Sequence, residues 1–371
     1  MYLPPQLPIR LAHRITELEA LPYGLSDTAG VKRCRDWYVQ SFSELVTCPV
    51  PRTNESEEHF AQLLATIYER HANTLINMSA GLAEVHKAMA GPDGQVPIVV
   101  EDTISPFLDS FYSSRIGIRT LIQQHLAMRQ KPEEGWAGVI KTDMSPEDVA
   151  LKAMYVMQHM SPHAPSPVLT VVCWCSNDAT QMCERALGDA PEVEVIAPEG
   201  FTFGYIPSYL HHMLFEVIKN SMRAVVEHHG VGNVLPPVRV VVSGCNGNED
   251  CVIKVADEGG GIPRSAVDRV WKYMYTTAQP VLDHEALLDA ARDFGTDTPL
   301  AGLGYGLPLS RLYARYWGGE LQIISMEGFG TDTYLHLRLD GASRERVATA
   351  GAGFWRAAAN AFAKTNHPAT A

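Results

Sequence analysis

The spacing of the apolar residues changes once along this chain, and that change limits the possible folds more than any other feature. From Leu7 to about Leu126 apolar residues recur at helical spacing, as in residues 60–67. After about Pro165 the sequence turns to short β-rich runs that alternate with helical stretches. The pattern predicts a helical bundle followed by an α/β domain.

The length of 371 residues fits two domains better than one, because a single core rarely serves more than about 250–300 residues. We expect a bundle at residues 1–165, an α/β domain at 166–345 and a tail at 346–371. The boundary between the first two falls somewhere between residues 136 and 198, because VLTVV and VEVIA both fit the first strand.

Composition and charge exclude two classes of protein. With 46% hydrophobic residues and no apolar run near the roughly 20 residues of a membrane span, we expect a globular chain without such a span. The net charge of −12 repels phosphate backbones, so nucleic acid is not an expected partner. The seven cysteines lack C-x-x-C spacing, and we expect them to be reduced.

Polar side chains form one stripe on the helix predicted for YLHHMLFEVIKNSMRAVVEHH. His212, Glu216, Asn220 and Arg223 are spaced 4, 4 and 3 residues apart, so they share a face, with Lys219 beside them. The other side carries apolar residues that can be buried, namely Leu214, Val217, Ile218 and Val225. Taken alone, a polar stripe also fits a solvated helix face.

A second motif, CVIKVADEGGGIP, joins a strand to a glycine-rich turn. The alternation through Val255 predicts a buried strand, and Asp257 stands at its end before Gly259 to Gly261. Glycines there allow close backbone approach, and the carboxylate can accept a hydrogen bond from a buried exocyclic amine such as that of adenine. The motif alone also fits a turn that is capped by an aspartate.

Two further glycine-rich motifs follow. Gly302, Gly304 and Gly306 precede a helix with Pro308 in its first turn, where free backbone N–H groups and the helix dipole favour a phosphate. The spacing is neither G-x-G-x-x-G nor a Walker loop. EGFGTD, between the strands ELQIISM and TYLHLRL, predicts a hairpin with Thr331 at the start of the return strand.

In this order, the four motifs resemble the N, G1, G2 and G3 boxes of the ATPase superfamily of gyrase, Hsp90, histidine kinases and MutL. HHMLFEVIKNSMRA, YMYTTA, GYGLPLSRLYARYWGG and SMEGFGTD resemble mitochondrial pyruvate dehydrogenase kinases, and LPIRLAHRI and FYSSRIGIR extend the resemblance through the N-terminal half. The implied fold class is α+β with two domains, an N-terminal helical bundle and an α/β sandwich ATPase domain.

The resemblance implies a serine protein kinase that transfers the γ-phosphate of ATP to the dehydrogenase (E1) component of the pyruvate dehydrogenase complex and inactivates it. Its implied cofactors are ATP and Mg²⁺. Its implied partners are E1, the lipoyl domain of the acyltransferase core and a second copy of the chain in a homodimer. The implied location is the mitochondrial matrix, although no clear presequence is readable.

The resemblance also implies roles for single residues. Glu216 would be the catalytic base, oriented by His212, and Asn220 would give an oxygen to Mg²⁺. Asp257 would hold adenine, and residues 276–301 would form a lid that nucleotide orders. The implied ATP-binding residues are Glu216, Asn220, Arg223, Asp257, Gly261, Thr276, Thr277, Gly302, Leu303, Gly304, Tyr305, Gly306, Leu307 and Thr331.

A regulatory site is implied in the helical half. Arg115 and Arg119 are four residues apart on one helix face, so two guanidinium groups can converge on one carboxylate. In the resembled kinases this helix lines an inhibitory pocket for pyruvate-like acids, with a histidine that His71 matches. Tyr68 stands where the animal kinases have an arginine, which lowers the expected affinity for a small carboxylate.

Several alternatives stay open. The arginine pair also fits an exposed pair in salt bridges with Asp109 or Glu101. A branched-chain 2-oxoacid dehydrogenase kinase, or a non-kinase ATPase with ATP-gated conformational change, would use the same boxes. A histidine kinase would need a phosphoacceptor among His71, His86 and His125.

Two departures from the family pattern affect the expected fold. About 30 residues between Ser145 and Ser176 are additional, so the helix before the first strand is either SPEDVALKAMYVMQ or SNDATQMCERAL. The tail lacks the terminal Asp-Trp pair that is typical of the family.

Overall fold

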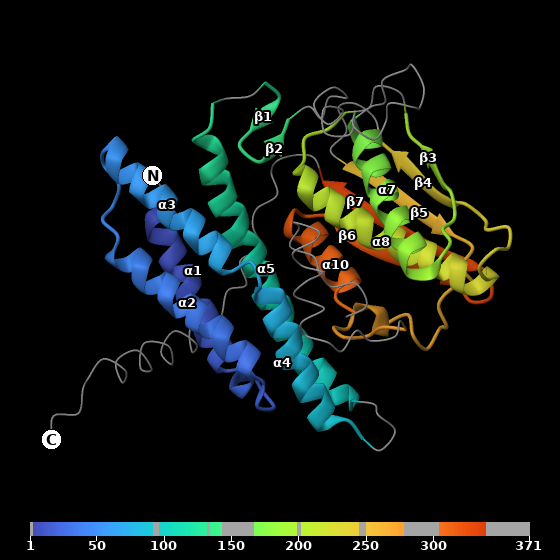
Figure 1. Ribbon diagram of the computed structural model, residues 1–371, viewed down its shortest axis with the longest axis horizontal. Coiled ribbons are helices and arrows are strands. Elements are labelled where there is room, and N and C mark those ends of the chain that lie inside the picture. Colours follow the sequence, from blue (N-terminus) through green and yellow to red (C-terminus); the bar gives the residue numbers. More distant parts are fainter. Residues whose placement is uncertain are drawn as a thin grey trace.

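The computed structural model describes residues 3–91, 96–131, 134–142, 167–198, 202–244, 250–277 and 304–338. Helices form the N-terminal half, and the C-terminal half contains a sheet with helices across one face (Figure 1). The N-terminal elements are α1 (Leu3–Glu19), η1 (Leu25–Asp27), α2 (Ala29–Thr47), α3 (Asn54–Arg70), α4 (Thr74–Met89) and α5 (Ile98–Met128). The others are β1 (Trp136–Ala137), β2 (Ile140–Lys141), α7 (Pro167–Leu187), β3 (Val193–Ile196), α8 (Pro207–His229), β4 (Val238–Ser243), β5 (Asp250–Asp257), η2 (Arg269–Trp271), α10 (Gly306–Tyr316), β6 (Glu320–Met326) and β7 (Gly330–Arg338).

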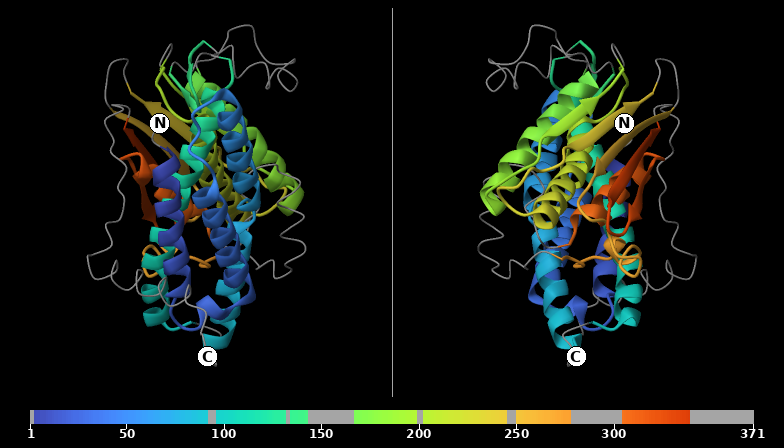
Figure 2. Two further views of the ribbon diagram at one scale, coloured as in Figure 1. Left: turned by 90° about the vertical axis from the view of Figure 1, so that its left-hand side faces the viewer. Right: turned by 90° about the vertical axis from the view of Figure 1, so that its right-hand side faces the viewer.

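The predicted helical bundle is confirmed. α3 begins with a capping box, in which the side chains of Thr53 and Ser56 each accept the other's backbone N–H. α5 contains 31 residues and is therefore about 46 Å long. The bundle helices run side by side (Figure 2). None of the helices in the described part of the chain is long and apolar enough to cross a membrane.

The VLTVV run is not a strand, which corrects one of the two alternatives for the first strand. It forms the first turns of α7. Its β-branched residues favour a strand, but Cys175, Ala179 and Cys183 recur every four residues and are buried, so helical packing against α8 prevails. SNDATQMCERAL is thus the helix that precedes β3, the VEVI strand, whereas residues 145–158 lie outside the described part.

In the described part of the chain, five strands form a mixed sheet in the order β3-β4-β5-β7-β6. β3 and β4 pair in parallel, and the other neighbours pair antiparallel. Along β5 the buried residues alternate as predicted, namely Cys251, Ile253 and Val255. The register pairs Asp257 with Thr331, so the ends of two glycine-rich motifs lie side by side.

The core of the bundle extends into the C-terminal half. Besides residues of the N-terminal helices, it contains Tyr273 and Tyr305, which flank the predicted lid, and Leu309 and Leu312 of α10. A second core fills the space between the sheet and helices α7, α8 and α10. The helical bundle and the region that contains the sheet are therefore packed through a shared apolar contact.

Candidate active site

The catalytic candidate on α8 is a buried carboxylate. Glu216 is only 3% exposed, so the alternative of a solvated helix face is wrong at this position. Both of its oxygens accept hydrogen bonds from Lys219 Nζ, at 2.6 Å each. The His212 ring, one turn earlier, lies 5.0 Å from the Tyr313 ring, and its predicted contact with Glu216 stays a prediction. The apolar side of the helix is buried as expected, at Leu214, Val217, Ile218 and Val225.

The next turns of α8 reach the start of the predicted lid. Asn220 and Arg223 are both partly buried. Arg223 donates from Nη2 to Thr277 Oγ1 at 2.5 Å, and from Nε to Glu227 at 2.9 Å. Thr276 directly precedes Thr277, so the structure brings both predicted lid threonines beside the helix that carries Glu216.

Asp257 is buried at the end of β5, with 7% of its surface exposed. Its Oδ1 accepts the backbone N–H of Gly259 at 3.0 Å and that of Thr331 at 3.2 Å. Burial raises the pKa of this carboxyl above its ordinary value, while hydrogen bonds from Ser221 and the two backbone groups act in the opposite direction. A carboxylate has about four lone-pair positions, so it can accept a further donor such as an exocyclic amine.

Two glycines of the predicted site are required by close contacts. Gly261 has φ 72°, and a Cβ there would lie 2.2 Å from the backbone oxygen of Met326. A Cβ on Gly306, the first residue of α10, would lie 2.0 Å from Glu216 Oε2. The glycine-rich turn before α10 therefore approaches the catalytic candidate directly.

The remaining residues of this turn are only partly described. Gly304 has φ 70°, Tyr305 is fully buried, and Leu307 is partly buried. Gly302 and Leu303 lie outside the described residues, as does the tail from residue 346. Thr331 stands at the start of β7 after a short hairpin, as predicted, and its hydroxyl lies 3.0 Å from Ser325 Oγ.

The arginine pair on α5 is buried, which overturns the alternative of an exposed pair in salt bridges. Arg115 donates from Nη2 to the backbone oxygen of His71 at 3.1 Å. Arg119 donates to the backbone oxygen of Tyr68 at 3.3 Å, and its Cζ lies 3.7 Å from the centre of the Tyr68 ring. Asp109 instead accepts a hydrogen bond from Tyr273. The structure thus brings the predicted regulatory residues together.

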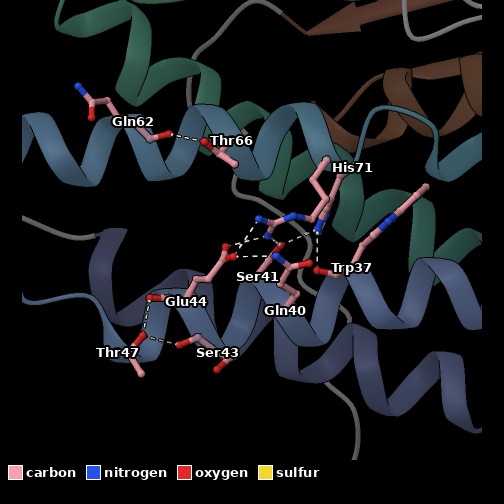
Figure 3. A network of polar contacts seen from close by, with 10 residues as sticks. Trp37, Gln40, Ser41, Ser43, Glu44, Thr47, Gln62, Thr66 and His71 are labelled. Atoms are coloured by element: carbon pink, nitrogen blue, oxygen red, sulfur yellow. Dashed lines mark hydrogen bonds and ion pairs between the residues drawn. The ribbon is translucent and has the colours of Figure 1, made fainter.

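His71 lies in a polar network between α2 and α3 (Figure 3). Its Nε2 lies 3.0 Å from Ser41 Oγ and 3.3 Å from the Trp37 backbone oxygen, and its ring lies 4.3 Å from that of Tyr38. Burial lowers the pKa of His71 to about 3, and nearby arginines act in the same direction. Ser41 and Tyr38 were not predicted. They are three residues apart on α2, a spacing that places both on one helix face.

A buried aromatic cluster at the two ends of the predicted lid was also not predicted. The rings of Tyr273 and Tyr305 lie 5.2 Å apart, and Tyr112 of α5 lies 5.6 Å from the first and 6.1 Å from the second. Tyr273 donates to Asp109 Oδ1 at 2.6 Å. The residues that flank the predicted lid are therefore anchored to the helix that carries the arginine pair.

Metal binding by protein side chains alone is not indicated in the described residues, where no three His, Cys, Asp or Glu side chains are grouped to hold an ion. Asn220 can still offer one amide oxygen, one turn from Glu216. Together the residues can hold a base at Asp257, approach phosphates through a glycine-rich helix start, and present a buried carboxylate to a reacting group.

Known protein families match both the N-terminal and the C-terminal half of the chain. The family described as "Mitochondrial branched-chain alpha-ketoacid dehydrogenase kinase" matches residues 1–141, and the "Histidine kinase-, DNA gyrase B-, and HSP90-like ATPase" family matches residues 206–341. The mitochondrial pyruvate dehydrogenase (acetyl-transferring) kinase of Arabidopsis thaliana is 43% identical over 93% of this chain and 85% of that protein. The corresponding values are 38%, 91% and 76% for the Drosophila melanogaster kinase, and 34%, 100% and 78% for human isozyme 1. The chain belongs to the family of the mitochondrial pyruvate dehydrogenase kinases.

Proposed function

We propose that this protein is a pyruvate dehydrogenase (acetyl-transferring) kinase, which transfers the γ-phosphate of ATP to a serine of the E1 component and inactivates it. The observation that carries the proposal is the buried Glu216 on α8, paired with Lys219 and approached by the glycine-rich start of α10. The names of the relatives, at 34–43% identity, support the same activity.

Asp257 would bind the adenine base of the nucleotide. This carboxylate is fixed by two backbone N–H groups, so it can accept the exocyclic amine of adenine without moving. Gly261 allows this turn to pack directly against the backbone of Met326, where any side chain would clash, and so keeps the turn beside Asp257 in place. Thr331 completes the same edge. The turn from Gly302 to Leu307 would then follow the phosphates.

Magnesium fits this site through a single protein ligand. The amide oxygen of Asn220 is a hard donor of the kind Mg²⁺ prefers, and Mg²⁺ commonly keeps waters and binds substrate phosphates besides one or two protein oxygens. When bound, the ion would neutralise charge on the transferred phosphate. Asn220 lies four residues after Glu216 on α8, so the phosphate end of the nucleotide would face the catalytic carboxylate.

The carboxylate of Glu216 would act as the base that accepts the proton of the attacking serine hydroxyl. Lys219 donates to both of its oxygens, which holds the carboxylate in one orientation. His212 would help to orient it from one turn earlier on α8. Phosphoryl transfer depends chiefly on positioning and charge neutralisation, so these contacts supply what the chain itself must contribute.

The direct test is to incubate the full chain with radiolabelled ATP, Mg²⁺ and purified E1. We expect acid-stable label on E1, which Glu216→Gln abolishes. Glu184→Gln, at an exposed glutamate of the neighbouring helix α7, is the matched control and should label E1 normally. Acid-labile label on the chain itself would instead indicate a histidine kinase, and release of free phosphate alone would indicate a non-kinase ATPase.

A second candidate substrate is the branched-chain 2-oxoacid dehydrogenase, because the family that matches residues 1–141 carries that name. We favour pyruvate dehydrogenase, because the relatives that match 91–100% of this chain at 34–43% identity are named pyruvate dehydrogenase kinases. Parallel assays with the two E1 proteins distinguish the candidates. Faster labelling of the branched-chain E1 would reverse the assignment.

We infer a regulatory carboxylate site at Arg115, Arg119 and His71. Two buried guanidinium groups beside a neutral imidazole fit a small acid such as pyruvate. Tyr68, which stacks on Arg119, takes the place of a further positive charge, so we expect weak affinity. Titration of pyruvate or dichloroacetate against wild type and Arg119→Ala is the test. Inhibition that is absent, or unchanged by the substitution, would refute this site.

The expected partners follow from the same family. We infer a homodimer through the sheet, because Ile324 and Met326 of the edge strand β6 and Phe329 of the next turn are exposed apolar residues. Light scattering that gives only the 40.8 kDa mass of one chain would refute it. We also infer a location in the mitochondrial matrix and binding to the lipoyl domain of the acyltransferase core. We assign substrate docking and regulation to residues 1–165, ATP binding and phosphoryl transfer to residues 166–345, and a C-terminal tail to residues 346–371.

A further inference from the structure

A series of polar contacts leads from the arginine pair on α5 to the catalytic helix α8. Arg119 stacks on the ring of Tyr68, at 3.7 Å from its centre. Gln123, one turn later on α5, donates from Nε2 to the Tyr68 hydroxyl at 2.5 Å. The Tyr209 hydroxyl of α8 donates to Gln123 Oε1 at 3.3 Å and lies 2.7 Å from Thr120 Oγ1. These contacts join α3, α5 and α8.

The Tyr209 hydroxyl has two competing partners. A hydroxyl carries one proton, so it donates to either Thr120 or Gln123 at any moment. Thr120 itself donates to the backbone oxygen of Ile116 at 2.8 Å, which leaves its oxygen free to accept from Tyr209. Because Tyr209 and Thr120 are both buried, a hydroxyl that lost its partner would stay unsatisfied. The position of Gln123 therefore decides between two discrete arrangements.

Tyr209 lies close to the catalytic residues. It stands three residues before His212 and seven before Glu216 on the same helix, so the three side chains share one face. Its ring lies 4.9 Å from that of Tyr313 on α10, which in turn lies 5.0 Å from the His212 ring. One small cavity, between α5, α8 and α10, is lined by Arg115, His212 and Tyr313 among others.

We propose that Gln123 and Tyr209 are positioning residues through which a small carboxylate at the arginine pair alters the catalytic helix. A carboxylate that binds the N–H edge of Arg119 competes with the hydrogen bond from Arg119 to the backbone oxygen of Tyr68, and so displaces the guanidinium that stacks on the Tyr68 ring. Tyr68 then shifts relative to Gln123, and Tyr209 exchanges its partner. The inference rests on the proposed kinase activity and carboxylate site, and it adds the route between them.

Tyr209→Phe is the main test, because it removes the hydroxyl and keeps the ring. Tyr205→Phe is the matched control, because Tyr205 is also buried and its hydroxyl has no hydrogen-bond partner among the residues that the structure describes. Gln123→Leu is a second variant, which breaks the same contact from α5. For each full-length protein, calorimetry gives the Kd for MgADP with and without saturating dichloroacetate, and the Kd for dichloroacetate alone.

We expect dichloroacetate to change the Kd for MgADP in wild type and in Tyr205→Phe by the same factor. In Tyr209→Phe and Gln123→Leu, the ratio of the Kd for MgADP with dichloroacetate to the Kd without it should move towards one. This ratio should differ from that of wild type by up to about fivefold, which corresponds to one hydrogen bond of about 1 kcal/mol. Dichloroacetate should still bind these two variants, because both arginines remain. A purely structural defect would instead weaken both ligands without changing the factor.

Three results would overturn the proposal. They are an unchanged factor in both Tyr209→Phe and Gln123→Leu, an equal change in Tyr205→Phe, and no effect of dichloroacetate on the nucleotide affinity of wild type. None of these measurements uses E1. A failure of wild type to phosphorylate E1 would therefore refute the proposed function separately.

Discussion

Replacement of His71 by glutamine should remove a pH dependence from folding. Burial, with the charges of Arg115, Arg70 and Arg119, lowers the pKa of His71 to about 3 in the folded protein, against about 6.5 in an unfolded chain. Between these values the unfolded chain binds a proton that the folded protein excludes, so stability falls as the pH falls. One pH unit in this window corresponds to about 1.4 kcal/mol, which gives about 2 kcal/mol lost by pH 5.

Urea unfolding at pH 7 and pH 5 measures this contribution. The loss of unfolding free energy between the two pH values should be about 2 kcal/mol smaller in His71→Gln than in wild type. Glutamine keeps a donor and an acceptor for Ser41 and the Trp37 backbone oxygen, so the network of Figure 3 is largely preserved. His59→Gln, at an exposed histidine of α3, is the control and should behave as wild type. An equal loss in wild type and His71→Gln would refute the reasoning.

Four substitutions in the active site should separate the roles of its residues. Glu216→Gln should slow transfer to E1 by at least about 100-fold in single-turnover assays and leave MgADP affinity unchanged, because it removes only the base. Asn220→Ala should abolish the Mg²⁺ dependence of ATP binding, measured by calorimetry with and without the ion. Asp257→Ala should weaken ADP binding by about tenfold or more, and equal binding of GTP and ATP by wild type would contradict its role. Gly306→Ala should slow transfer by about 100-fold, because the new Cβ would lie 2.0 Å from Glu216 Oε2 and would displace this carboxylate; normal transfer would contradict the assigned base.

The order of the elements could be predicted from the sequence because their patterns are local. Helical spacing predicted the bundle, alternation predicted β5, and the runs on either side of the EGFGTD hairpin predicted β6 and β7. VLTVV was ambiguous because five β-branched or aliphatic residues fit a strand by themselves. Only the buried positions of Cys175, Ala179 and Cys183, which lie beyond that run, identify the helix.

Residues of the candidate site could be predicted where they lie on one helix or strand. They could not be predicted where tertiary packing brings distant residues together. The stripe on α8 is a matter of spacing, so Glu216 could be named, and Lys219 was seen beside it. Burial of Glu216, and the pairing of its carboxylate with that lysine, depend on tertiary structure. The contact of His71 with Ser41 joins residues 30 positions apart, and Tyr112 meets Tyr273 from still farther along the chain, so no local pattern signals either.

The apolar contact of α5 with Tyr273 and Tyr305 limits how members of this family can be recombined. A chimera that joins this bundle to another ATPase region keeps the chain continuous but replaces one side of a densely packed core. Protein interiors pack like organic crystals, so an overfilled position costs about 1–3 kcal/mol and a vacated large side chain about 2–5 kcal/mol. Crossover libraries should therefore yield folded enzymes mainly when Tyr112, Tyr273, Tyr305 and Leu309 come from the same parent.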